Sequence, residues 1–398
     1  MRRRFRMAQL LLLLAFVPCI SFTAAQVQGI ERPERAITWQ PDIEFDAQLF
    51  PAFVLAMANR KATPTDPSYI GDPNGVIGIR ARATRPDTHF RLSVAVDGLS
   101  AASTLEGTLK EADKEYRVFP SVRYDSRALM RIDQSYPTNV VISVSADGGA
   151  AEEKTVPIQV RSVHDVPLSW QGEDGKVHDS TFLFGSFVNE NHPWIDQLLS
   201  EALKHGAIRS FRGYQAGSQE VERQVFAIWN VLQRRDVRYS SITRASGESG
   251  RVRSQHVRFL DEAINNAQAN CVDGSLIFAS VLYKLDMCPV LVLMPGHMFV
   301  GIHVDAASCG TSRNLVFLET TLVGNPGLGR VERTWPFQTQ DGYLASKSYR
   351  LYVNARQVGD QRFRSIIPHL QAKEPGYHVI DVSEARKFGI SAIAHPPD

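Results

Sequence analysis

The segment from Cys271 to Glu319 constrains the fold more than any other part of this chain. It opens with CVDGSLIFASVLYKLD, whose length and apolar content indicate a helix. Two short apolar runs follow, and the Pro295-Gly296 pair between them predicts a tight turn that joins two strands. A third strand is expected near 314–320. A helix followed by antiparallel strands predicts an α+β domain in this part of the chain.

Chain geometry predicts that the first turn returns to the start of this helix. A helix over 271–286 rises about 1.5 Å per residue, so it carries the chain about 22 Å away from Cys271. A strand over 289–294 covers about 20 Å at about 3.3 Å per residue. If the strand runs antiparallel to the helix, it brings the chain back to the level of Cys271. His297 stands at the turn that follows.

The next hairpin predicts where Glu319 lies. The loop AASCGTSR reverses the chain, and we expect Val304 to face Arg313 across it. In that register Glu319 lies opposite Met298, one residue from His297. The imidazole is therefore expected to lie near both a thiol and a carboxyl group.

These three side chains are the parts of a nucleophilic cysteine site. We predict Cys271 as the catalytic nucleophile, His297 as the acid and base, and Glu319 as the group that orients the imidazole. A helix N-terminus and a neighbouring imidazolium both favour the reactive thiolate. Backbone N–H groups at the start of the helix are expected to stabilise an oxyanion. Gln255 and Gln268 are side-chain candidates for that task by residue type alone.

The other cysteines are expected to be structural. Cys288 and Cys309 flank the open end of the predicted hairpin, where a disulfide between them would leave Cys271 as the free thiol. Two reduced cysteines are the alternative at this stage. No CxxC or HxxxH spacing is present, so neither a metal site nor a cofactor is predicted.

Residues 1–25 predict a secretory signal peptide, because the basic MRRRFR precedes an apolar run that ends in small residues. Cleavage before Gln26 removes four arginines and changes the formal net charge from +2 to −2. Such a balance gives no argument for a nucleic-acid partner. No later apolar run reaches the about 18 residues of a spanning helix, so no stable membrane span is expected after cleavage. We predict an exported protein, periplasmic or extracellular.

Pattern changes divide the rest of the chain. Residues 26–168 alternate apolar and polar side chains between Gly, Pro and Asp clusters, which predicts an all-β, Ig-like sandwich. Helical spacing begins after about residue 175, so 175–355 is expected to form the α+β catalytic domain. The tail, 356–398, is expected to be an extension that packs on that domain.

The motifs NCVDGSLIFASVLYKL, PVLVLMPGHMFV and LVFLETTL resemble those of the transglutaminase-like superfamily, whose core is papain-like. The upstream VFAIWNVLQRRDVRYS is similar to the family's helix before that core. The resemblance covers roughly 180–350 and points to an exported bacterial type of member. By this match Cys271 falls on the nucleophile, His297 on the base and Glu319 on the acid. The family's acid is usually Asp, and Ala269 stands where the family often has Gly.

The resemblance implies a cysteine peptidase or acyltransferase that acts on amide bonds through a thioester. Hydrolysis, deamidation and transamidation are all compatible with it, and the implied partner is a protein or peptide with an accessible amide. Animal relatives use calcium, but no acidic loop predicts a calcium site here. The alternative is a non-catalytic envelope or surface-binding protein that keeps the fold, because the superfamily includes members that have lost activity.

Overall fold

A computed structural model describes most of the chain from Arg35 onward. The described residues are 35–172, 175–240, 249–324, 331, 336–339 and 341–393. Those from Ala36 onward form one compact unit that mixes sheets and helices. The signal peptide expected over 1–25 lies outside the described residues.

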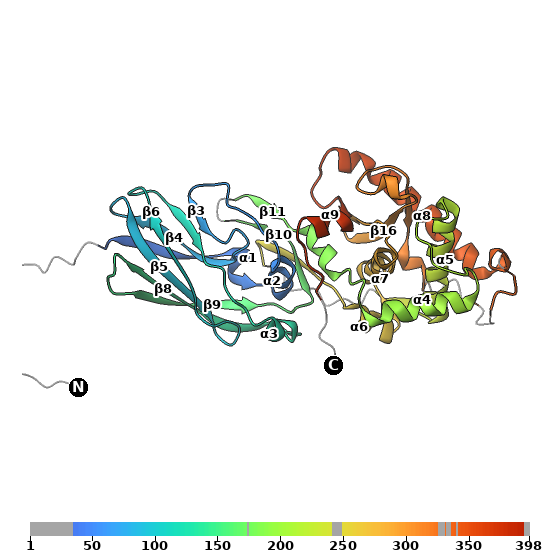
Figure 1. The fold of residues 1–398 in the computed structure, drawn as a ribbon, viewed down its shortest axis with the longest axis horizontal. Coiled ribbons are helices and arrows are strands. Elements are labelled where there is room, and N and C mark those ends of the chain that lie inside the picture. Colours follow the sequence, from blue (N-terminus) through green and yellow to red (C-terminus); the bar gives the residue numbers. More distant parts are fainter. Residues whose placement is uncertain are drawn as a thin grey trace, which may run out of the picture. The chain divides into compact units, whose positions relative to one another are not determined.

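Two sheets dominate the first part of the chain (Figure 1). The four-stranded sheet has the order β1 (Ile37–Ile43), β4 (Ile77–Ala83), β7 (Tyr116–Phe119) and β3 (Tyr69–Gly71). The five-stranded sheet has the order β2 (Gln48–Leu49), β9 (Glu152–Val160), β8 (Tyr136–Ala146), β5 (Thr88–Val96) and β6 (Ser103–Leu109). Short helical turns are α1 (Glu44–Ala47), α2 (Pro51–Met57) and α3 (Ser126–Met130). Buried residues of both sheets belong to one hydrophobic cluster, so the sheets pack against each other.

The sequence pattern explains these strands. In β5 every second residue from Phe90 to Val96 is buried, and the residues between them are more exposed. This period of two gives the strand one face toward the cluster and one away from it. Strands β8 and β9 pair in antiparallel register. The turn between them contains Asp147 and Gly148, whose φ angles of 49° and 74° suit a tight hairpin turn.

The second part of the chain is built around a four-stranded antiparallel sheet. Its order is β17 (Leu315–Leu318), β16 (His297–His303), β15 (Pro289–Met294) and β18 (His378–Asp381). Smaller sheets join β11 (Val177–Asp179), β10 (Asp165–Gln171) and β13 (Val252–His256), and β12 (Arg238–Tyr239) with β14 (Gln268–Ala269). The α-helices are α4 (Pro193–His205), α5 (Ser218–Arg234), α6 (Leu260–Asn265), α7 (Cys271–Lys284), α8 (Lys347–Gln371) and α9 (Val382–Lys387). The described 3-10 turns are η1 (Thr181–Phe187), η2 (Ala306–Ser308), η3 (Thr320–Leu322) and η5 (Gly342–Ala345).

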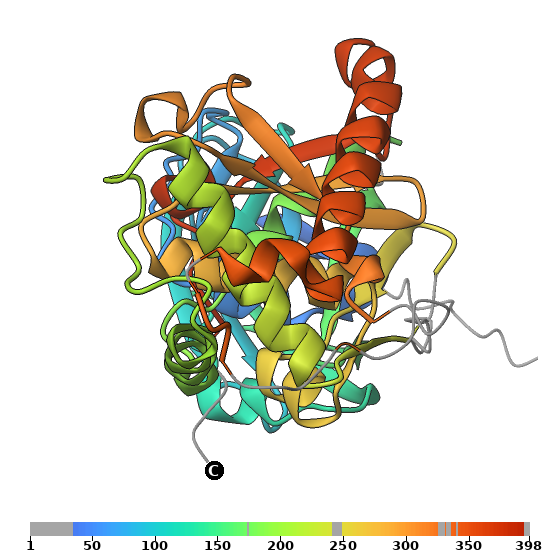
Figure 2. The same ribbon diagram turned by 90° about the vertical axis from the view of Figure 1, so that its right-hand side faces the viewer.

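Helices α7 and α8 cover opposite faces of the β17-β16-β15-β18 sheet. Leu291 and Val300 belong to the large hydrophobic cluster that contains the buried residues of α7. Val292 and Phe299, on the other face, form a separate cluster with Ile366 of α8. Figure 2 shows α8, in red, alongside these strands. The β16 end that carries His297 therefore lies between two helices.

Both expected domain boundaries fall inside secondary-structure elements. Residue 168 lies within β10, which pairs with β13 from much later in the chain. Residue 355 lies within α8, which runs without a break to Gln371. The tail expected as an extension also supplies β18, which pairs with β15. The tail is therefore part of the domain that contains His297, because its strand β18 belongs to the same sheet.

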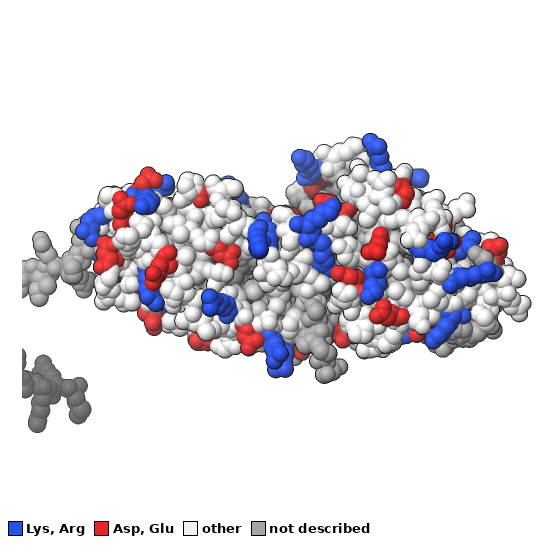
Figure 3. Space-filling model, in the orientation of Figure 1, with Lys and Arg blue, Asp and Glu red and all other residues white. Residues whose placement is uncertain are grey.

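Within the described ranges, no helix combines the length and the apolar composition that crossing a bilayer requires. On the face that Figure 3 displays, Lys and Arg side chains are interspersed with Asp and Glu. Mixed charges of this kind agree with a formal net charge of only +2 for the whole sequence. They give this face no large field of one sign that would steer a highly charged partner.

Candidate active site

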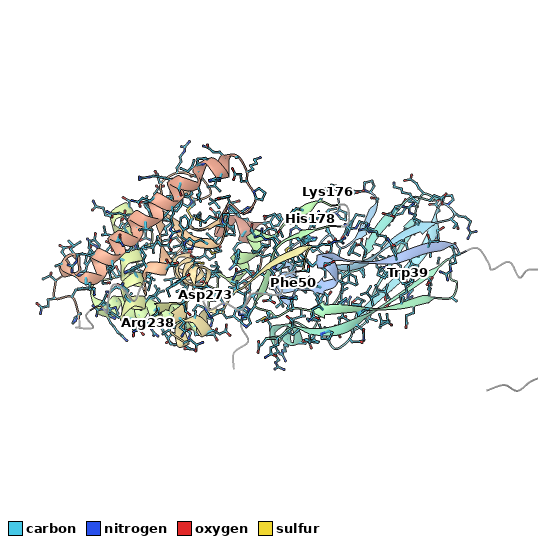
Figure 4. The ribbon with its side chains drawn as sticks, turned by 180° about the vertical axis from the view of Figure 1, so that it is seen from behind. Trp39, Phe50, Lys176, His178, Arg238 and Asp273 are labelled. Carbon is cyan, nitrogen blue, oxygen red and sulfur yellow. A yellow bond between two sulfur atoms is a disulfide. The ribbon has the colours of Figure 1, made fainter. Side chains whose placement is uncertain are left out.

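Helix α7 begins at Cys271 because the residue before it caps the helix. The Asn270 side-chain oxygen accepts hydrogen bonds from the N–H groups of Val272 and Asp273, at 2.8 and 2.9 Å. The Asp273 carboxylate accepts the Asn270 N–H in return at 3.1 Å, which completes a capping box. The same buried carboxylate pairs with Arg258 at 2.7 Å. Figure 4 shows Asp273 among the helices around α7.

The cap reduces the number of N–H groups that can bind an oxyanion. The N–H groups of Val272 and Asp273 are used by Asn270, and the Gly274 N–H donates to the Asn270 carbonyl at 3.0 Å. In the described part of the chain, the Cys271 N–H donates no hydrogen bond to the protein. Of the backbone N–H groups predicted to stabilise an oxyanion, only that of Cys271 is therefore left to do so.

Cys271 carries a free, partly exposed thiol. Cys288 and Cys309 are joined by a disulfide, with their Cα atoms 5.7 Å apart. The proposed pairing of these two cysteines is thereby confirmed, and the alternative with both reduced is not what the structure has. The only reduced sulfur of the described cysteines is the one at the helix start.

His297 is the first residue of β16, directly after a two-residue turn. Met294 pairs with His297 across this turn, and Gly296 adopts a φ of 72°, which glycine tolerates without strain. Burial by itself lowers the pKa of His297. Hydrogen bonds to Cys271 and Glu319, and the negative charges of both, outweigh burial and raise that pKa to about 9. Since Nε2 of the ring contacts Glu319, Nδ1 is the nitrogen that is left for the thiol.

Glu319 is almost completely buried and is held through both carboxylate oxygens. Its Oε2 lies 2.8 Å from His297 Nε2 and 2.8 Å from Arg362 Nε. Its Oε1 accepts the hydroxyl and the N–H of Thr321, at 2.6 and 3.1 Å. Burial by itself raises the pKa of Glu319, but His297, Thr321 and Arg362 outweigh it and hold that pKa below its usual range. The group is a fixed carboxylate anion beside an imidazolium.

The residue after Glu319 connects the acid to the helix of the thiol. Thr320 opens η3 and its hydroxyl lies 3.3 Å from that of Ser275 on α7. A Cβ at Gly274 would lie only 3.0 Å from the same Thr320 oxygen, so η3 and α7 approach closely. This approach brings the end of β17 to the level of Cys271. The chain thus returns to the level of Cys271, as the helix and strand lengths predicted.

The register of the second hairpin differs from the expectation by one residue. Val304 faces Asn314, with its N–H 3.0 Å from the Asn314 carbonyl, whereas the sequence analysis paired it with Arg313. The turn η2 occupies the loop and Asn314 adopts a left-handed φ of 48°, which takes up one more residue. The contact between Glu319 and His297 survives because Glu319 lies past the end of β17, where the side chain is not fixed by the ladder.

Helix α8 fixes the backbone that carries Glu319. The Glu319 N–H donates to the Ala355 carbonyl at 3.1 Å. A Cβ at Gly359 would lie 2.7 Å from the Phe317 carbonyl carbon and 2.8 Å from the Leu318 nitrogen, so helix and strand touch through their backbones. Only glycine allows this approach. No helix was predicted here from the sequence.

Tyr239 is a further polar group near the thiol. It lies on β12 and pairs with Ala269, two residues before Cys271. It also lines a small cavity with Gly274 of α7. Burial raises the pKa of the Tyr239 phenol, and the charges of Cys271 and Glu319 raise it further. The phenol is thus a protonated O–H donor in the electrostatic range of the site.

Of the two glutamines considered for the oxyanion, Gln255 is held by another hydrogen bond. The Gln255 amide donates to the His256 carbonyl at 2.9 Å on β13. Gln268 is exposed on β14. Neither Tyr239 nor Arg362 was predicted as a site residue from the sequence. The spacing of three residues between Gly359 and Arg362 would have placed these two on the same side of one helix. Among the described residues, no group of three or more His, Cys, Asp or Glu side chains is arranged to hold a metal ion.

No protein-family model matches this chain, and no curated protein matches it. The resemblance to transglutaminase-like proteins therefore depends on the three motifs and on the arrangement of Cys271, His297 and Glu319 within the fold.

Proposed function

We propose that this protein is an exported, transglutaminase-like cysteine enzyme with a papain-like catalytic core, acting on amide bonds through a thioester. One observation carries the proposal. A free thiol at a capped helix start lies close enough to the His297 imidazole to raise the pKa of that ring, and Nε2 of the ring lies 2.8 Å from a buried carboxylate. Nucleophile, base and orienting acid thus form one connected chain, as this chemistry requires.

The first half of the reaction forms the thioester. The pKa of about 9 keeps His297 protonated at neutral pH, and in the proposed mechanism this imidazolium stabilises the attacking Cys271 thiolate. The sulfur attacks the amide carbonyl carbon, and the oxyanion forms hydrogen bonds with the Cys271 N–H and the Tyr239 hydroxyl. When the C–N bond breaks, His297 Nδ1 gives its proton to the leaving amine.

The second half releases the acyl group. Water or an amine is deprotonated by the now neutral His297 and attacks the thioester carbon. The C–S bond breaks, and the sulfur leaves as the thiolate beside the re-formed imidazolium. Glu319 remains ionised throughout and stabilises the imidazolium in both steps. Water as acceptor gives hydrolysis or deamidation, and an amine gives transamidation.

Alkylation of Cys271 by iodoacetamide tests the proposal without a known substrate. The rate is followed from pH 4 to 10 by mass spectrometry of the Cys271 peptide. We expect rapid labelling at pH 6 to 7, because a neighbouring imidazolium favours the reactive thiolate. His297→Ala should lower the rate at pH 6.5 at least tenfold.

His369→Ala is the matched control. It removes a second His–Glu pair of 2.8 Å, His369 with Glu374, which lies at the C-terminal end of α8 with both side chains exposed. This variant should label like the wild type. Slow labelling of the wild type below pH 8, with no effect of His297→Ala, would instead favour a non-catalytic surface-binding protein.

A second measurement identifies the acceptor. A Gln-containing peptide is incubated with the protein and a primary amine, and its mass is measured. A gain of the amine mass less ammonia indicates transamidation, a gain of one mass unit indicates deamidation, and shorter peptides indicate hydrolysis of the chain. Cys271→Ala should give none of these products.

A further inference from the structure

We propose that Arg362 is a positioning residue of this site, which keeps Glu319 ionised and aimed at His297. The inference depends on the proposed function and deepens it, because it assigns α8 a part in the chemistry. Arg362 does not touch the reacting atoms. It acts through Oε2 of Glu319, the same oxygen that contacts the imidazole.

The contact with Arg362 restricts the movement of the flexible Glu319 side chain. A glutamate has one more rotatable bond than an aspartate, so its carboxyl group needs more contacts to stay in one place. Thr321 donates to Oε1, and His297 Nε2 hydrogen-bonds to Oε2 at 2.8 Å. Arg362 Nε lies 2.8 Å from the same Oε2 as an ion pair without hydrogen-bond geometry, and its side chain is 40% exposed. Without Arg362, the imidazole would be the remaining charged partner of Oε2 among these contacts. The arginine therefore supports the longer acid that this chain has.

The position of Arg362 is itself determined by the docking of α8. The Asp360 carboxylate accepts the Phe317 N–H at 3.1 Å, and Arg356 donates to the Phe317 carbonyl. Gly359 lets the helix approach the same residue in backbone contact. These contacts fix the helix turn from which Arg362 extends, so its guanidinium has a defined place beside Glu319.

The charged and titratable groups around Glu319 determine the sign of the effect. They come from four elements: Cys271 of α7, Tyr239 of β12, His297 of β16 and Arg362 of α8. Arg362 favours the ionised carboxylate, since an opposite charge stabilises it. Removing the cation lets Glu319 take up a proton at higher pH. A neutral Glu319 no longer supports the imidazolium, so the thiolate of Cys271 is lost at higher pH as well.

The test is the pH profile of Cys271 alkylation by iodoacetamide in four full-length chains: wild type, Arg362→Met, Arg362→Lys and Arg364→Met. We expect the acid-side midpoint of Arg362→Met to move up by about 1 pH unit, the order expected when an opposite charge a few ångströms away is removed. Arg362→Lys keeps the charge and should restore at least half of the shift. Arg364→Met makes the same change at an exposed position two residues away and should match the wild type.

The outcomes distinguish a failure of the proposed function from a failure of the role of Arg362. Rapid wild-type alkylation at pH 6.5 that is lost in His297→Ala supports the proposed function, and its absence would overturn both proposals. A normal wild-type profile that is unchanged in Arg362→Met would overturn this inference alone. A lower melting temperature of Arg362→Met with an unshifted midpoint would make the residue structural, which also overturns the inference.

Discussion

His297 Nε2 lies 2.8 Å from Glu319 Oε2, and the Glu319 side chain is only 1% exposed. A buried carboxylate in this position favours the protonated imidazole, because the charge of each group offsets the burial of the other. The imidazolium in turn offers its second nitrogen to Cys271. The pair therefore links the protonation of the site to the stability of the fold.

The first prediction concerns stability against pH. The pKa of His297 is raised from 6.5 to about 9 on folding, so the folded state binds this proton more tightly than the unfolded state. The stabilisation is fully present below pH 6.5 and is lost as the pH rises through 9. It amounts to about 3 kcal/mol at most. Urea unfolding at pH 6, 7.5 and 9.5 should show this loss in the wild type and not in His297→Gln. Equal pH dependence of the two chains would contradict the coupling.

The second prediction concerns the capping box of α7. Asp273→Asn removes the charge that pairs with Arg258, and the Asp273 side chain is fully buried. We expect a loss of about 2 to 4 kcal/mol in urea unfolding, since breaking a buried ion pair leaves its partner poorly compensated. Asp196→Asn on α4 is the control, because its pair with Lys284 is 3.8 Å long and exposed. It should change stability by less than about 0.5 kcal/mol.

The third prediction concerns the contact between α8 and β17. Gly359→Ala places a methyl group 2.7 Å from the Phe317 carbonyl carbon, where backbone must move. Overpacking of this kind costs about 1 to 3 kcal/mol, and the displaced strand end should also slow the alkylation of Cys271. Gln357→Ala, at an exposed position of the same helix, should change neither quantity. Normal stability of Gly359→Ala would show that the helix can move away at no cost.

The fourth prediction separates the disulfide from the chemistry. The bond between Cys288 and Cys309 closes a loop with a sequence separation of 21. The double substitution to serine should lower the free energy of unfolding by about 3 kcal/mol. The pH profile of Cys271 alkylation should stay unchanged, because the bond lies at the opposite end of β15 from His297. A shifted profile would place the disulfide in contact with the site.

The fifth prediction uses two reagents on one thiol. Acylation of Cys271 by a p-nitrophenyl ester passes through an oxyanion, whereas alkylation by iodoacetamide does not. Tyr239→Phe removes one oxyanion donor and should slow acylation about 10- to 100-fold while leaving alkylation within twofold. Tyr136→Phe, at an exposed position of β8 in the first part of the chain, is the control for the loss of a phenol. Equal slowing of both reactions would mean that Tyr239 acts on the thiol and not on the oxyanion.

The segment that carries the candidate site could be predicted from the sequence because its geometry is local. Helix rise, strand rise and a two-residue turn were sufficient to bring His297 to the level of Cys271, and α7, β15 and the turn appear where they were expected. The hairpin before Glu319 was wrong by one residue. Loop length alone does not reveal that η2 and the left-handed Asn314 lengthen the connection.

Helix α8 was not predicted because its apolar residues are few and charged residues stand between them. Its buried positions Tyr352, Ala355, Gly359 and Ile366 follow helical spacing, but one of them is a glycine and arginines are frequent around them. Glycine argues against a helix on propensity, yet here it is required by the approach to Phe317. The support of Glu319 by Arg362 is a contact between distant segments, which no local pattern specifies.

The same docking has a consequence for the solubility of shortened chains. β17 is an edge strand, and α8 satisfies its outward Phe317 N–H and carbonyl as well as the Glu319 N–H. A chain that ended near residue 355 would leave these groups unpaired along an apolar strand. Such edges recruit strands from other molecules, so the truncated protein should self-associate into β-rich aggregates.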